Sequence, residues 1–150
     1  MRLADLLDEK VIKIGLASED KEECLEELVD LLVRSERVSD RQSAVAALHQ
    51  RERLGSTGIG NGVAIPHGKS TTVKNLTAAL GVSRDGIEFD SVDGEPVHVV
   101  FLVLAEANNP GPHVAALAEI ARLLQVPGFC RRLSEAPTAE AVLDIFNEEE

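Results

Sequence analysis

The sequence predicts an α/β protein of the mixed α+β kind, with one mixed β-sheet covered by helices on both sides. Segments with helical spacing of apolar residues alternate with short apolar runs that are typical of strands. The run from Val97 to Leu104 is apolar except at His98, as expected of a central strand that is buried on both faces. Because no repeat, low-complexity segment or linker interrupts this pattern, residues 1–150 are expected to form a single domain.

The first half of the chain is divided into elements by its apolar spacing and its capping residues. Ser18 and Ser39 are the expected N-caps of two helices, since a hydroxyl there can accept a hydrogen bond from the first turn. Pro66 is expected to end the ladder of a short strand, because it has no N–H to donate. The expected elements are a short helix over residues 2–8, a strand from Val11 to Leu16, helices over residues 20–35 and from Ser39 to about residue 51, and a strand from Val63 to Ile65.

The second half is expected to start with a strand and to end with three helices. Pro112 suits the first position of a helix, which puts His113 in its first turn. Thr138 is the expected N-cap of the last helix, and Glu148–Glu150 are expected to form a frayed acidic tail. The expected elements are a strand from Leu76 to Val82, a turn at 84–86, the Val97–Leu104 strand, a helix from Pro112, a short helix over residues 127–134 and a helix ending at Phe146.

The composition is that of an acidic protein with few aromatic residues. The net charge is −11, only 3% of the residues are aromatic, and Trp and Tyr are absent. Excess negative charge disfavours DNA and anionic membranes, and scarce aromatic residues disfavour stacking on single-stranded nucleic acid. No apolar run approaches the ~18 residues of a membrane span, and Cys24 and Cys130 lack the spacing of a redox or metal motif. We therefore expect a cytoplasmic protein that binds no nucleic acid and does not insert into membranes.

The stretch from Arg51 to Ser70 contains four glycines between positions 55 and 62. Glycines allow backbone conformations with positive φ and a close approach of N–H groups to a bound group, although an ordinary turn with an incidental histidine is also possible. A nucleotide-binding loop is excluded by spacing, because the ending Gly68-Lys69-Ser70 requires a glycine where Val63 stands. The glycine spacing also differs from the dinucleotide-binding fingerprint.

His67 follows this stretch and is a candidate for carrying a phosphoryl group. An imidazole with a pKa near ~6.5 is largely a free nucleophile at physiological pH. Residues 51–74 contain four basic side chains and one acidic one, a net charge of +3 that suits a locally bound anion. His113 is a second candidate, since a helix N-terminus attracts anions and keeps an imidazole neutral. A chance histidine in a first helical turn remains the alternative for His113.

The motif from Arg51 to His67, Arg-Glu-x-x-Gly-Ser-Thr-Gly-Ile-Gly-Asn-Gly-Val-Ala-Ile-Pro-His, resembles the signature of enzyme IIA of the bacterial phosphotransferase system. The resemblance is to the fructose/mannitol class, most closely its nitrogen-regulatory branch, and it covers nearly the whole chain. It implies the fold of that class and a phosphoryl relay without metal or other cofactor. It assigns the phosphoryl-accepting role to His67, a phosphate-facing role to Arg51 and a second active-site role to His113. Ser56 and Thr57 are expected to support the phosphoryl group from the glycine-rich turn.

The partners implied by this resemblance are a phosphocarrier protein, HPr or its nitrogen-branch counterpart, and a downstream recipient. The recipient is either a set of regulatory targets in nitrogen or potassium physiology, which we favour, or a fructose- or mannitol-type enzyme IIB during sugar uptake. A reading from another class is a metal-binding hydrolase or sensor that uses His67, His113 and a carboxylate. No HExxH motif or cluster of Cys and His supports that reading.

Overall fold

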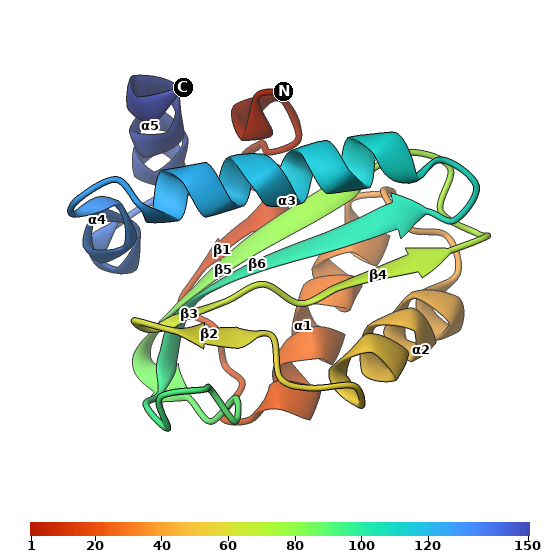
Figure 1. The fold of residues 1–150 in the computed structure, drawn as a ribbon, viewed down its shortest axis with the longest axis horizontal. Coiled ribbons are helices and arrows are strands. Elements are labelled where there is room, and N and C mark those ends of the chain that lie inside the picture. The colour runs from red at the N-terminus through yellow and green to blue at the C-terminus, as the bar shows by residue number, and fades with distance from the viewer.

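A mixed, six-stranded β-sheet organises the computed structural model, which describes all 150 residues (Figure 1). The strand order is β1-β5-β6-β3-β2, and β4 also pairs with β6. The pairs β1–β5, β3–β6 and β4–β6 are parallel, whereas β5–β6 and β2–β3 are antiparallel. The strands are β1 (Ile12–Ile14), β2 (Gly58–Gly60), β3 (Val63–Ala64), β4 (His67–Ser70), β5 (Thr77–Ile87) and β6 (Val97–Glu106).

The central strand is β6, which is buried along nearly all of its length, as the sequence predicts. On one side it pairs with β5, and on the other with β3 and then with β4. The ladder of β3 ends before Pro66, as expected, but the chain resumes pairing with β6 at His67. The carbonyl of Pro66 accepts a hydrogen bond from the N–H of Val103 at 2.9 Å. Pro66 therefore interrupts one edge of β6 without turning the chain away from it.

Five α-helices cover both faces of this sheet, and this confirms the predicted arrangement (Figure 1). Helix α3 crosses the front face in this view and α1 lies behind the strands. Helix α2 packs against α1 and β4, and α4 packs against α3, β5 and β6. The helices are α1 (Lys21–Arg34), α2 (Arg41–Glu52), α3 (Pro110–Leu124), α4 (Phe129–Glu135) and α5 (Ala139–Glu149), and two short 3-10 helices span Leu3–Asp5 and Glu9–Val11.

The N-caps of the first two helices differ from the prediction. Asp20 caps α1 and Asp40 caps α2, each accepting a hydrogen bond from the backbone N–H three residues later. Ser18 instead donates its hydroxyl and N–H to the carboxylate of Glu27. The cap predicted at Ser39 is likewise wrong by one residue. Aspartate is as good a cap as serine, so sequence alone did not choose between neighbouring candidates.

The turn predicted at residues 84–86 is absent, because β5 continues through these residues to Ile87. The pairing of β5 with β6 shifts register between Val82 and Ile87, which is the geometry of a β-bulge. Gly86 has a φ of 91° and donates its N–H to the hydroxyl of Ser83. A glycine with positive φ thus extends the strand through a bulge instead of ending it.

The C-terminal residues are held in place, so the frayed tail that we predicted is wrong. Thr138 caps α5 as expected, but the helix continues past Phe146 to Glu149. The carboxylate of Glu150 accepts hydrogen bonds from the N–H groups of Leu3 and Ala4 at 2.8 and 2.9 Å. These bonds join the two ends of the chain.

Candidate active site

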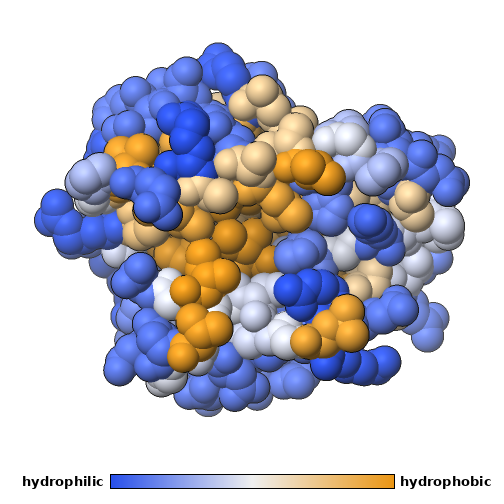
Figure 2. Space-filling view, viewed as in Figure 1, coloured by the Kyte–Doolittle hydropathy of each residue, from blue (hydrophilic) through white to orange (hydrophobic).

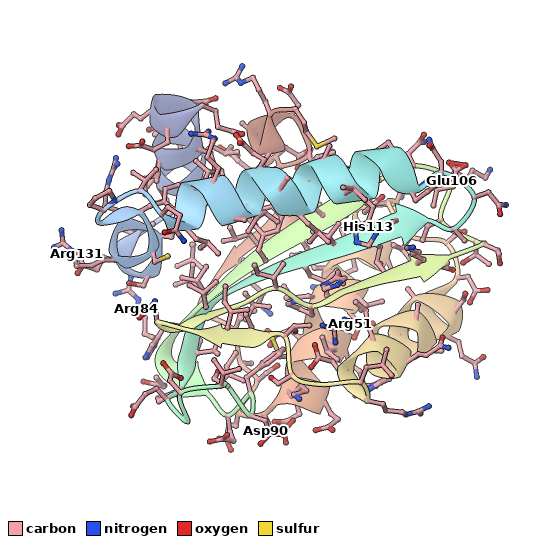
Figure 3. The ribbon with its side chains drawn as sticks, in the orientation of Figure 1. Arg51, Arg84, Asp90, Glu106, His113 and Arg131 are labelled. Carbon is pink, nitrogen blue, oxygen red and sulfur yellow. The ribbon has the colours of Figure 1, made fainter.

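An open cleft with a volume of about 460 Å³ lies between α2, β4 and the start of α3. Figure 3 shows Arg51 and His113 on the front face of the molecule, on either side of β4. The charged and titratable side chains that line the cleft are Arg51, His67, Lys69 and His113, and no carboxylate is among them. In a chain with a net charge of −11 this cleft is locally basic, which suits an anion.

Apolar side chains gather on the same face, along the lower side of α3 (Figure 2). Leu54 and Val114 line the cleft and expose 84% and 65% of their surface. Helix α3 starts at Pro110, two residues before the predicted Pro112. Exposed apolar residues around a polar centre are typical of a surface where another protein docks.

His67 is the first residue of β4 and its ring is half-buried. Its Nδ1 lies 2.8 Å from the carbonyl oxygen of Ile65. Because a carbonyl can only accept, Nδ1 must carry the hydrogen in this contact. In the neutral ring the free lone pair is then on Nε2.

His113 lies in the first turn of α3, as predicted, and only 5% of it is exposed. Its ring is 5.5 Å from the ring of His67, measured between centroids, in an edge-to-face arrangement. Burial lowers the pKa of His113, and the nearby positive charges of His67 and Lys69 lower this pKa further. Its buried Nε2 has no hydrogen-bond partner. A neutral imidazole with a free nitrogen beside His67 is suited to bind a group placed there.

Arg51 lies in the last turn of α2, and its guanidinium donates a hydrogen bond to the carbonyl of Gly55 at 2.8 Å. The approach of α2 to β4 depends on Gly68, the residue after His67. A Cβ atom at Gly68 would lie 2.9 Å from the carbonyl oxygen of Ala47, which is too close for any side chain. Glycine therefore lets the backbones of α2 and β4 meet and brings Arg51 to the cleft of His67.

Lys69 also lines the cleft, although the sequence prediction did not include it among the site residues. Side chains alternate along a strand, so Lys69 shares the face of β4 that carries His67. In the sequence, the only indication of this role is that Lys69 follows His67 by two residues. That spacing places both side chains on one face only if residues 67–70 form a strand, which the sequence did not predict.

The structure does not bring Ser56 and Thr57 into the cleft. The hydroxyl of Ser56 donates to the carbonyl of Phe89 at 2.7 Å. Thr57 is 3% exposed, and both its N–H and its hydroxyl are bonded to the carboxylate of Glu52. In this structure both residues hold the glycine-rich segment in place.

A protein-family model described as "Phosphoenolpyruvate-dependent sugar phosphotransferase system, EIIA 2" matches residues 5–149. The chain belongs to this EIIA 2 family. The resemblance in the motif from Arg51 to His67 is thereby confirmed for the family as a whole.

The relatives of this EIIA 2 chain fall into two groups by name, nitrogen regulatory proteins and fructose-specific components. A "Nitrogen regulatory protein" of Bradyrhizobium diazoefficiens is 36% identical over 147 residues, which are 97% of this chain and 95% of the relative. The fructose-specific EIIABC component of Bacillus subtilis is 37% identical over 148 residues, or 99% of this chain, but the chain spans only 23% of that protein.

Solved structures of both nitrogen-regulatory and sugar-specific IIA proteins share the fold of this chain. The nitrogen regulatory protein IIA-Ntr of Neisseria meningitidis superposes with a TM-score of 0.88 at 33% identity, covering 96% of this chain and 98% of the other. IIA mannitol of Escherichia coli has the same fold, with a TM-score of 0.80 at 22% identity over 93% of this chain and 98% of the other. The predicted fold of the fructose/mannitol class is confirmed.

Two further features bear on the alternatives for this EIIA 2 chain. No group of three or more His, Cys, Asp or Glu side chains is placed to hold a metal ion, so the metal-site reading lacks the carboxylate that it requires beside His67 and His113. None of the helices combines the length and the apolar character needed to cross a lipid bilayer.

Proposed function

We propose that residues 1–150 act as one phosphocarrier unit in which His67 accepts a phosphoryl group on Nε2. The observation that carries the proposal is the contact between Nδ1 of His67 and the carbonyl of Ile65, which leaves Nε2 with the lone pair. The donor is a phosphohistidine on a phosphocarrier protein, HPr or its nitrogen-branch counterpart. The P–N bond of the donor breaks and its electron pair returns to the donor imidazole, while the lone pair of Nε2 forms the new P–N bond.

The side chains around His67 have distinct roles in this proposal. Arg51 offsets the negative charge of the phosphoryl oxygens, because a guanidinium presents several N–H donors to such a group. His113 stays neutral and donates a hydrogen bond from Nε2 to one of these oxygens. The carbonyl of Ile65 stabilises the positive charge that develops on the ring of His67 as its Nε2 is phosphorylated. Positioning and positive charge supply what phosphoryl transfer needs, so the proposal requires no metal ion.

A regulatory role downstream is favoured by the relatives named nitrogen regulatory protein, which align with this chain over nearly their whole length. In this role the phosphorylation state of His67 controls binding to target proteins. The second candidate is transfer to a fructose- or mannitol-type enzyme IIB, and it is supported by the 37% identity to fructose-specific relatives.

The test is labelling of the purified protein with radioactive phosphoenolpyruvate, enzyme I and either HPr or its nitrogen-branch counterpart. We expect label on the wild type and none on His67→Ala. His49→Ala is the matched control, because His49 lies on α2 outside the cleft, and it should be labelled like the wild type. Label retained by His67→Ala would contradict the assignment.

The same labelled protein separates the two downstream roles. It is mixed with a fructose-type or a mannitol-type enzyme IIB, and the loss of label from this chain is followed. Rapid transfer to either IIB supports the sugar branch, whereas label that stays on this chain supports the regulatory branch.

A further inference from the structure

Lys69 lies on the same face of β4 as His67, and both side chains line one cleft. In the parallel pairing of β4 with β6, His67 lies opposite Val103 and Lys69 lies opposite Ala105. Strand β6 therefore places no charged side chain opposite either residue. The other charged or titratable groups that face the cleft are Arg51 from α2 and His113 from α3. Lys69 therefore faces a site without any counter-ion.

The ammonium group of Lys69 has no partner within the protein. Lysines 13 and 21 form ion pairs with Glu27 and Glu52, whereas Lys69 forms neither an ion pair nor a hydrogen bond. The guanidinium of Arg51 is already bonded to the carbonyl of Gly55. Lys69 is exposed and lies beside the proposed acceptor histidine, and it stays unpaired although the protein has 26 acidic residues. Its ammonium group is therefore available to bind an anion that comes from outside the protein.

We propose that Lys69 is a second phosphate-binding cation, whose ammonium group pairs with the oxygens of a phosphoryl group on Nε2 of His67. This inference rests on the proposed function of His67. A phosphoryl group bound to nitrogen carries one or two negative charges near neutral pH, and a nearby cation favours the form with two. Lys69 thus stabilises the fully ionised phosphohistidine and shifts the exchange equilibrium toward the phosphorylated chain.

The test is a titration of the phosphohistidine followed by ³¹P NMR. The protein is phosphorylated with phosphoramidate, a small donor that requires no docked carrier. The compared proteins are the wild type, Lys69→Gln, Lys69→Arg and Lys74→Gln. Lys74 is the matched control, because it is exposed and unpaired but lines a different cleft. The midpoint pH of the shift in the phosphorus resonance reports the charge around the phosphoryl group. A merely structural role of Lys69 would leave this midpoint unchanged.

We expect the midpoint to rise by about 0.5 pH unit in Lys69→Gln, to stay near the wild-type value in Lys74→Gln, and to be restored in Lys69→Arg. The difference should shrink as salt is added, since the cleft is open to solvent. A phosphohistidine that forms in the wild type and in Lys74→Gln but not in Lys69→Gln also supports the role.

Two outcomes overturn the inference in distinguishable ways. If a signal depends on His67 but has the same midpoint in the wild type, Lys69→Gln and Lys74→Gln, Lys69 does not contact the phosphoryl group and the function of His67 stands. If the wild type forms no phosphohistidine with phosphoramidate or with the phosphocarrier protein, or if His67→Ala retains the signal, the proposed function fails and the role of Lys69 fails with it.

Discussion

The orientation of the His67 ring depends on a single main-chain contact, the one from Nδ1 to the carbonyl of Ile65. Pro66 lies between the two residues of this contact. Because it has no N–H and interrupts the pairing with β6, the chain at Ile65 leaves the ladder just before His67 enters it. The contact with Ile65 places the hydrogen of the neutral His67 ring on Nδ1.

His113 is expected to titrate below the ordinary histidine pKa of about 6.5. Burial and the positive charges of His67 and Lys69 lower its pKa in the folded protein. The unfolded chain therefore binds this proton more readily, and the contribution of His113 to stability is lost as the pH falls from 6.5 through the lowered pKa. An NMR titration of the ring C–H resonances measures this pKa.

Phosphorylation of His67 should raise the pKa of His113 by about one unit, because a neighbouring negative charge favours the imidazolium. The His67→Ala variant treated with the same phosphodonor should show no such rise. A pKa of His113 at or above the ordinary value in the unphosphorylated protein would contradict the neutral donor that we propose.

Sequence reasoning placed three of the residues at this site but not all of them. His67, Arg51 and His113 were predicted, and the structure brings them to one cleft. Lys69 was not predicted, because it shares a face with His67 only when residues 67–70 form a strand, and the sequence predicted the strand to end at Pro66. Ser56 and Thr57 were favoured for their hydroxyls, yet those hydroxyls bond to Phe89 and Glu52. Composition shows which groups are available, but not which are already bonded.

At the scale of elements, the end of α2 is held by the buried carboxylate of Glu52. It accepts hydrogen bonds from the N–H and hydroxyl of Thr57, which precedes β2. It also pairs with Lys21 at the start of α1, with 3.2 Å between Nζ and Oε2. The neighbouring Arg51 points to the cleft from the same helical turn. Glu52 therefore joins α1, α2 and the glycine-rich segment next to the proposed phosphate-binding arginine.

Glu52→Ala should lower the free energy of unfolding by about 2–4 kcal/mol, because Thr57 loses its partner and Lys21 keeps only its longer ion pair with Asp90 at 3.7 Å. Urea denaturation followed by far-ultraviolet circular dichroism measures this change. Glu95→Ala is the control, since Glu95 is exposed in a loop and its side chain forms no bond. Equal stability of the two variants would show that the Glu52 contacts add nothing to the fold.

Most of the elements could be predicted from their apolar spacing, whereas their ends depend on contacts that are distant in sequence. Ser18 lost the N-cap role to Asp20 because Glu27 binds its hydroxyl. Helix α3 begins at Pro110, since either of two nearby prolines satisfies the local rule for a first turn. The bulge in β5 replaced a turn because β6 pairs with the strand on both sides of it.

At the scale of the whole molecule, the last helix is joined to the sheet through aromatic contacts. Phe146 of α5 is 1% exposed and packs against Phe101 of β6 and Phe129 of α4, with ring centroids 5.9 and 5.3 Å apart. The buried apolar residues form one cluster that extends from Leu3 to Phe146. The chain ends and the sheet therefore share one core.

Phe146→Ala should cost about 3–5 kcal/mol of unfolding free energy, through lost burial and the cavity that remains. Because the core is shared, we expect a single unfolding transition in this variant as in the wild type. Circular dichroism and the NMR signals of His67 should report the same midpoint in urea. Val92→Ala is the control, as Val92 is 77% exposed, and two separate transitions would contradict a single domain.

The backbone contact between α2 and β4 at Gly68 has a consequence for the energetics of exchange. No flexible side chain separates helix from strand there, so the spacing of Arg51 and His67 is set by main-chain atoms. Under the proposed function, a donor and a recipient meet the same preorganised surface one after the other. Neither has to drive a rearrangement of this chain, and the reorganisation energy is low in both directions of transfer. A fixed spacing therefore lowers the barrier for receiving the phosphoryl group and for passing it on by the same amount, and leaves the equilibrium of each transfer unchanged.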